Sequence, residues 1–335
     1  MPKGFNSLVK ERSADGVELV TLSGHGGKLR LSVAPALGGE IHSLRRLWRG
    51  RWIELLYRGK GSAEQPWRGG APWLFPAVGR SFAPRRPARQ GSGRPKKEPG
   101  FWSLAGVSYP MPIHGFVRNQ VWRRSAASGV FGFEARADDA TRVFYPFDYR
   151  FQARYFLEAK GLRAEATVAA GINNREAMPF SMGNHIAFVL PLAPGADAGA
   201  CRVRTPAREN RLLSPAGLLT GATRPANYRR GVSLREAPEL NNCALGGFGP
   251  GEAWAEIVDP ASFGVRVRQR EILSPGAAPK AAPEYFCFVF YGDERRGFLC
   301  PEPWVGVPNS LNDRQGVVLL KPGTEFRWEM TVEFF

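Results

Sequence analysis

The chain has 335 residues, a hydrophobic content of 43% and a formal net charge of +16. This length is enough to bury a large core, and the composition is ordinary for a globular protein. No stretch approaches 18 consecutive apolar residues, and the first ten residues contain no apolar core of a signal peptide. We therefore expect no transmembrane helix, no membrane partner and a cytoplasmic location.

The four cysteines are widely spaced and form no CxxC pair. Such spacing predicts reduced, structural thiols and no zinc site. The basic excess is partly local, because residues 84–100 carry six Lys or Arg against one Glu. That segment is rich in Pro, Gly and Ser and has no aromatic residue between Pro84 and Gly100. Nucleic-acid binding usually interleaves basic and aromatic residues, so we predict a basic loop insertion and no nucleic-acid partner.

Alternation of apolar and polar residues dominates the chain. It occurs, in chain order, at residues 29–33, 149–157, 162–168, 265–268 and 326–334. Period-two alternation is typical of strands with one buried face, and 28 prolines and 39 glycines supply many turns. Strand patterns continue on both sides of residues 84–100. The sequence therefore predicts an all-β chain, folded over residues 1–335 as a single large antiparallel β-sandwich.

Three segments present a polar side chain in apolar surroundings. Arg80 ends an apolar, proline-containing run, and its planar guanidinium suits hydroxyls or carboxylates. His114 precedes a glycine that allows close backbone approach. His185 follows Asn184 inside an apolar run, where a buried polar group needs a partner or a function. Taken alone, each of these residues also fits a purely structural role.

Near the C-terminus, Glu302 lies between Pro301 and Pro303 and is followed by Trp304. Proline fixes φ near −65° and restricts the residue before it to extended geometry. This predicts a carboxylate held on a stiff backbone beside a large apolar ring, as a general base facing a sugar requires. No nucleotide-binding, serine-hydrolase or zinc-protease motif occurs in the chain.

Taken together, the segments resemble the aldose 1-epimerase (galactose mutarotase-like) family. Six motifs match in the family's order: Val33–Gly39, Phe75–Arg80, Met111–Arg118, Pro179–His185, Pro301–Trp304 and Leu319–Gly323. The resemblance runs from about Leu29 to the C-terminus. It implies a large β-sandwich and an isomerase that interconverts the α and β anomers of a hexose, with neither cofactor nor metal.

By motif match, the resemblance makes His185 the general acid and Glu302 the general base. Arg80 and His114 would hold and polarise the sugar, and Trp304 would offer a platform for its C–H face. The family's usual substrate-binding aspartate has no match. Asn241 or Asn242 takes its place, which leaves the sugar specificity open.

Two alternatives follow from the same residues. His114–Asn119 and the segment at Arg68 resemble the hexose-6-phosphate branch, in which Arg68 and Arg118 would contact a phosphate by charge-assisted bonds. The missing aspartate also fits a non-catalytic carbohydrate-binding protein on the same scaffold. The oligomeric state is left undetermined.

Overall fold

The computed structural model describes residues 5–59, 69–82, 100–125 and 130–335. Within these ranges all ladders between named strands are antiparallel, and the α-helices are two short turns, α1 (Asp139–Arg142) and α2 (Ser310–Asp313). Five 3-10 helices accompany them: Pro35–Leu37, Val117–Asn119, Ala198–Ala200, Pro238–Leu240 and Pro283–Tyr285. The all-β prediction is confirmed. Arg68 and all but the last residue of the predicted basic loop at 84–100 lie outside the described residues.

The larger of two extended sheets contains nine strands. Their order is β19 (Val232–Ser233), β16 (Arg202–Arg204), β21 (Trp254–Val258), β22 (Gly264–Glu271), β26 (Glu325–Phe334), β12 (Gly161–Ala170), β11 (Tyr149–Glu158), β10 (Gly132–Arg136) and β9 (Arg123–Arg124). The alternating segments of the sequence form its central strands. In β11, for example, every second side chain from the first residue is buried, because the pleat sends successive side chains to opposite faces.

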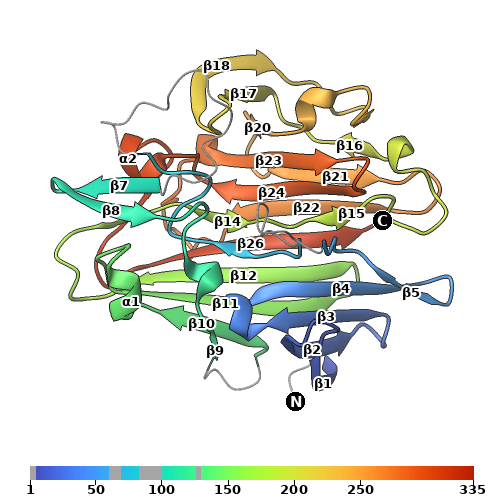
Figure 1. The fold of residues 1–335 in the computed structure, drawn as a ribbon, viewed down its shortest axis with the longest axis horizontal. Helices are drawn as coiled ribbons and strands as arrows, with labels where there is room; N and C mark the ends of the chain where they lie inside the picture. The colour runs from blue at the N-terminus through green and yellow to red at the C-terminus, as the bar shows by residue number, and fades with distance from the viewer. Residues whose placement is uncertain (1–4, 60–68, 83–99, 126–129) are drawn as a thin grey trace.

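The second extended sheet contains eight strands. Their order is β18 (Leu219–Pro225), β17 (Glu209–Leu213), β20 (Cys243–Gly246), β23 (Phe286–Asp293), β24 (Phe298–Val305), β14 (Met182–Asn184) and β6 (Trp73–Leu74), and β15 (Phe188–Val189) also pairs with β24. The strands of both sheets run across the molecule in Figure 1.

Aromatic side chains join the two sheets into one core. The Trp73 ring of the eight-stranded sheet meets Phe151 and Trp328 of the nine-stranded sheet at centroid separations of 5.7 and 6.1 Å. Phe180, which belongs to a smaller two-stranded ladder, meets Phe326 of the nine-stranded sheet at 5.6 Å. Edge-to-face and tilted contacts of this kind add to the free energy of area burial.

Smaller sheets complete the fold. A five-stranded sheet, at one end of the molecule in Figure 1, contains β1 (Phe5–Arg12), β2 (Glu18–Gly24), β3 (Leu29–Ala34), β4 (Glu40–Trp48) and β5 (Arg51–Glu54). Two-stranded ladders join β7 (Gly100–Leu104) to β8 (Val107–Met111) and β13 (Met178–Phe180) to β25 (Val318–Leu320).

The eight-stranded sheet is apolar on both faces around β24. One face of β24 joins the main core through Leu299 and Val305, whereas Phe298, Cys300 and Trp304 belong to small clusters on the opposite face. Since side chains alternate along a strand, Glu302 lies on the same face as Cys300 and Trp304. The fold therefore presents this carboxyl group on the side of the sheet that faces away from the core.

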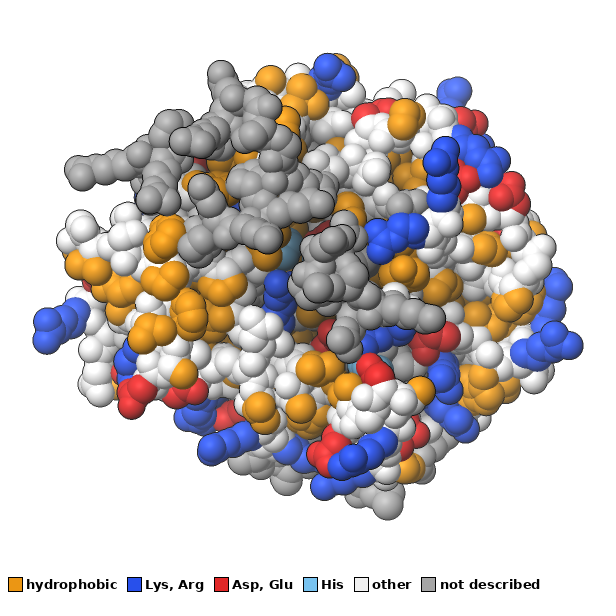
Figure 2. Space-filling view, viewed as in Figure 1, with side chains coloured by type: hydrophobic (Ala, Val, Ile, Leu, Met, Phe, Trp, Pro, Cys, Tyr) orange, Lys and Arg blue, Asp and Glu red, His pale blue; other side chains and the backbone are white. Residues whose placement is uncertain are grey.

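Among the described residues, no helix combines the length and apolar character needed to cross a bilayer. Lys and Arg side chains are scattered over the visible face of the molecule rather than gathered in one patch (Figure 2).

Candidate active site

The backbone pairing on one side of β24 is interrupted at its centre. β14 pairs Gly183 with Trp304, and β15 pairs Phe188 with Leu299. The four residues between them, 184–187, instead turn to the chain at 70–72, where His185 N–H donates to Pro72 O and Ala187 N–H to Gly70 O. The centre of β24 is thus open on this side.

The prolines of the Pro-Glu-Pro sequence explain this interruption. Gly306 N–H donates to Tyr285 O at 3.0 Å, so even-numbered residues of β24 exchange hydrogen bonds with β23, because these bonds alternate between neighbours. Pro301 and Pro303 therefore direct their nitrogens away from β23. Having no N–H, they offer no donor to residues 184–187. The same two residues that stiffen β24 also prevent a continuous ladder.

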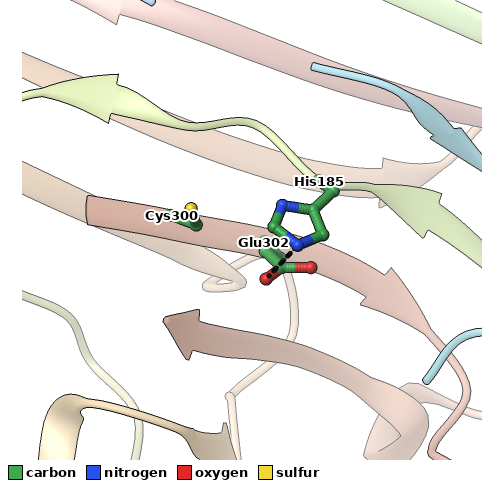
Figure 3. Close-up of side chains that lie close together, drawn as sticks. All are labelled: His185, Cys300 and Glu302. Atoms are coloured by element: carbon green, nitrogen blue, oxygen red, sulfur yellow. Dashed lines mark ion pairs between the residues drawn. The ribbon is translucent and has the colours of Figure 1, made fainter. Parts of the chain in front are cut away.

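The interruption brings His185 and Glu302 together. Continuing the register of the flanking pairs, Gly183 with Trp304 and Phe188 with Leu299, places His185 directly opposite Glu302. Cross-strand neighbours point to the same face. Accordingly, His185 Nε2 lies 3.3 Å from Glu302 Oε1 (Figure 3). Two residues that are far apart in the chain thus form one close side-chain pair.

Burial sets the electrostatics of this pair. The side chains of His185 and Glu302 are only 9% and 2% exposed. Burial lowers the pKa of His185 to about 3, assisted by the Arg118 charge, and raises the pKa of Glu302 well above its usual value. Both shifts have one cause, because burial disfavours the charged form of each group.

Trp304 supports the carboxyl group directly. Its indole Nε1–H donates to Glu302 Oε2 at 3.2 Å, and this bond opposes the rise in the pKa of Glu302. The side chain is buried at 3% exposure. The predicted platform role of Trp304 stays a prediction, whereas its contact with Glu302 adds a positioning role.

His114 lies beside both groups. Its ring centroid is 5.4 Å from that of His185 and 5.6 Å from the Trp304 ring. Gly79 N–H donates to His114 Nδ1 at 3.1 Å, so the neutral imidazole carries its proton on Nε2. Burial and the charges of His185 and Arg118 lower the pKa of His114 well below its usual value. His114 is thus a neutral hydrogen-bond donor.

Two arginines contribute positive charge to the site. Burial lowers the pKa of Arg118, which is half-buried in the 3-10 turn Val117–Asn119, whereas the charges of Glu40 and Glu302 favour the charged guanidinium. Arg80 is half-buried, and its charge lowers the pKa of His114. Arg80, His114, Arg118, His185 and Glu302 therefore interact with one another in one part of the structure, and their roles toward a substrate stay predictions.

Asn241 and Asn242 lie farther from the pair. Both are exposed and directly precede β20, and Asn242 N–H donates to Phe290 O on β23. Because β23 separates β20 from β24, the asparagines are about two strand spacings, roughly 10 Å, from β24. Their contact with substrate stays a prediction. Arg68 is outside the described residues.

Two neighbours of the pair were not singled out from the sequence. Cys300 is fully buried on the same face of β24, two residues before Glu302. Tyr291 is half-buried on β23, pairs with Cys300 and lies 6.5 Å from the His185 ring. The alternation of the strand around Glu302 would have identified Cys300, whereas Tyr291 required the strand register.

Comparisons with known proteins identify the family and the fold. The family model for aldose 1-epimerase matches residues 80–333. No curated protein sequence matched the chain significantly. Among solved structures, a galactose mutarotase-like protein from Clostridium acetobutylicum has a TM-score of 0.73 at 20% identity and covers 98% of each chain.

Two further solved structures share the fold. A galactose 1-epimerase from Lactobacillus acidophilus has a TM-score of 0.66 at 16% identity, with 98% of each chain covered. A putative aldose 1-epimerase from Escherichia coli K12 has a TM-score of 0.64 at 19% identity, covering 92% of this chain and 96% of the other. The structural likeness establishes a galactose mutarotase-like fold, and the family model shows that this chain belongs to the aldose 1-epimerase family.

Proposed function

We propose that this protein is an aldose 1-epimerase that interconverts the α and β anomers of a hexose by acid–base ring opening. The observation that carries this proposal is the buried His185–Glu302 pair, with Nε2 and Oε1 separated by 3.3 Å on the face of β24 away from the core. An acid and a base at this separation can serve the O1 and O5 atoms of one pyranose, which share the anomeric carbon.

In the reaction, Glu302 as a carboxylate takes the proton of the C1 hydroxyl, and protonated His185 donates a proton to O5. The C1–O5 bond breaks, and C1 becomes the aldehyde carbon. Rotation about C1–C2 presents the other face of the aldehyde. Ring closure then returns the proton from O5 to His185 and the proton from Glu302 to O1. Each positioned acid or base typically contributes about 10²–10⁴-fold.

The electrostatics of the pair favour the ring-opening step. The closed sugar faces an ion pair, protonated His185 and ionised Glu302, whereas the open sugar faces a neutral pair. Burial lowers the pKa of His185 and raises that of Glu302. When His185 gives its proton to the substrate and Glu302 takes one from it, both groups become neutral, which removes the free-energy cost of two buried charges. His114, with its Nε2–H donor, can bind a sugar oxygen without taking part in the transfers.

A phosphorylated hexose is a second candidate substrate. It is favoured by the half-buried Arg118 guanidinium, whose electrostatic interaction with Glu302 places a fixed positive charge at the site. A phosphate would gain charge-assisted hydrogen bonds from such a group. A neutral hexose needs no such charge, so the two candidates differ in a measurable way.

Polarimetry on freshly dissolved α-glucose, α-galactose and α-glucose 6-phosphate tests the proposal. We expect the protein to accelerate the approach to anomeric equilibrium for at least one of them, and Glu302→Gln to abolish this acceleration. A higher kcat/KM for glucose 6-phosphate would favour the second candidate. Spontaneous rates for all three sugars, with tryptophan fluorescence changes on sugar binding, would instead indicate a non-catalytic carbohydrate-binding protein.

A further inference from the structure

Cys300 is a buried thiol that the proposed acid–base chemistry does not use. It lies on the same face of β24 as Glu302, with His185 opposite Glu302 (Figure 3). One ligand atom from each of His185, Cys300 and Glu302 can be chosen so that all three lie within 4.8 Å of one another. This is the one such group of His, Cys, Asp and Glu found in the described part of the chain.

We propose that His185, Cys300 and Glu302 form an inhibitory binding site for Zn²⁺, with imidazole nitrogen, thiolate and carboxylate as ligands. Only the inhibitory effect of the ion rests on the proposed function, because the ion would occupy the groups that exchange protons with the sugar. The site cannot be recognised from the spacing of its residues in the sequence, because His185 and Cys300 are brought together by the pairing of β14 and β15 with β24.

The donor set suits zinc. Zn²⁺ binds sulfur, imidazole nitrogen and carboxylate oxygen, with three protein ligands and one open position in non-structural sites. Bond lengths near 2.0–2.3 Å place tetrahedral ligand atoms about 3.3–3.8 Å apart. The separation of 3.3 Å between His185 Nε2 and Glu302 Oε1 lies at the lower end of this range. Shortening a ligand-atom separation of up to 4.8 Å to the same range takes about 1.0–1.5 Å.

The charges of the donors also suit the ion. A thiolate from Cys300 and a carboxylate from Glu302 together balance the two positive charges of Zn²⁺, and the imidazole of His185 binds as a neutral ligand. A neutral metal–ligand group avoids the desolvation penalty of adding net charge to the interior. Arg118 is the neighbouring fixed charge that opposes the ion.

Direct metal binding tests this inference without reference to turnover. Tag-free protein is stripped with a chelator and titrated with Co²⁺, a spectroscopic probe for zinc sites. We expect a thiolate-to-cobalt charge-transfer band in the wild type and in Cys243→Ser, a matched buried-cysteine control. The band should be lost in both Cys300→Ser and Cys300→Ala. Zn²⁺ affinity should fall by more than about 100-fold in these variants, beyond the loss typical of an outer-shell change.

Calorimetry in buffers of different ionisation enthalpy adds a second readout. Binding of one Zn²⁺ should release at least about one proton in the wild type, since the thiol must lose its proton to become a ligand. Absence of the charge-transfer band in the wild type would overturn the site, and so would its persistence in folded Cys300→Ser. If Cys300→Ser and Cys300→Ala both fail to fold, His185→Asn with Cys300 intact must show weakened binding. Unchanged Zn²⁺ affinity there would overturn the site as well.

Inhibition is measured separately by polarimetry. We expect Zn²⁺ to stop wild-type anomer exchange, a chelator to restore it, and Cys300→Ser to retain exchange in the presence of Zn²⁺. A protein that binds Zn²⁺ with Cys300 but never accelerates mutarotation would retain the metal site while refuting the proposed function.

Discussion

Trp304 donates its indole N–H to Glu302 at 3.2 Å from a position two residues along the same strand. Because alternate residues share a face, the strand geometry alone delivers this donor to the carboxyl group. The bond stabilises the ionised form and so opposes the effect of burial on the pKa of Glu302.

Trp304→Phe should therefore raise the pKa of Glu302 further and slow the reaction. Hydrogen bonds to charged groups contribute about 1.5–3 kcal/mol, so we expect a fall in kcat/KM of at least about tenfold. Because the pKa of Glu302 is the higher of the two in the pair, it sets the alkaline limb of the pH profile, and this limb should move to higher pH. The control is Trp102→Phe, which removes an indole bonded to Phe144 O rather than to the site. An alkaline limb at its wild-type position would refute this role of Trp304.

His114 should act without titrating. Since burial and neighbouring charges hold its pKa well below the usual value, it stays neutral throughout the working range. His114→Asn, chosen because asparagine tolerates the positive φ of 65° at this position, should reduce kcat without moving either limb of the pH profile. Kinetics from pH 5 to pH 9 check this. A shift of the acid limb in this variant would show that His114 itself exchanges protons.

Glu302→Gln should stabilise the fold at high pH. The folded-state pKa of Glu302 is raised above its unfolded value, so the folded state keeps a proton that the unfolded chain releases. Wild-type stability from this group is complete below the unfolded pKa and is lost as pH rises through the folded pKa. Glu302→Gln has no such loss, so its free energy of unfolding in urea should exceed that of the wild type by an amount that grows between pH 5 and pH 8.

A second buried glutamate provides the matched control. Glu256 is 1% exposed and forms ion pairs with Arg204 and Arg266. Breaking a buried ion pair from one side typically costs about 3–5 kcal/mol, so Glu256→Gln should destabilise the protein at every pH at which the fold is stable. If Glu302→Gln were destabilising to the same extent at pH 8, Glu302 would be a structural ion-pair partner rather than a strained functional group.

Arg118→Met should shift both limbs of the pH profile upward. The Arg118 charge lowers the pKa of both His185 and Glu302, so its removal raises both. If the substrate is phosphorylated, KM for glucose 6-phosphate should rise far more than KM for glucose. Arg123→Met, at an exposed position on β9, should change neither. If both limbs of the pH profile stay at their wild-type positions in Arg118→Met, the Arg118 charge does not act on the acid–base pair.

The strands were predictable from the sequence because their signal is local. Alternation at residues 149–157, 162–168 and 326–334 became β11, β12 and β26, since period-two patterning requires no knowledge of the partner strand. The strand order is not local. Neighbours such as β12 and β26 are far apart in the chain, and no composition signal specifies that pairing.

The site was predictable only in part. His185 and Glu302 could be named from motifs, but their opposition follows from a register that two separate strands determine. The rigidity expected of the Pro-Glu-Pro sequence follows from residue chemistry and stays a prediction. Its second effect, withholding N–H donors from residues 184–187, emerges only when β14 and β15 are seen on the same side of β24. Cys300 was assigned a structural role because its neighbours in space were unknown.

The account depends most on His185 and Glu302 acting as one unit. Anomer-exchange rates measured by NMR at equilibrium, for the wild type, His185→Asn, Glu302→Gln and the double variant, test this directly. We predict that each single change lowers the rate by about 10²–10⁴-fold and that the double variant is no slower than the worse single one. Wild-type exchange in either single variant, or losses that multiply in the double variant, would contradict the account.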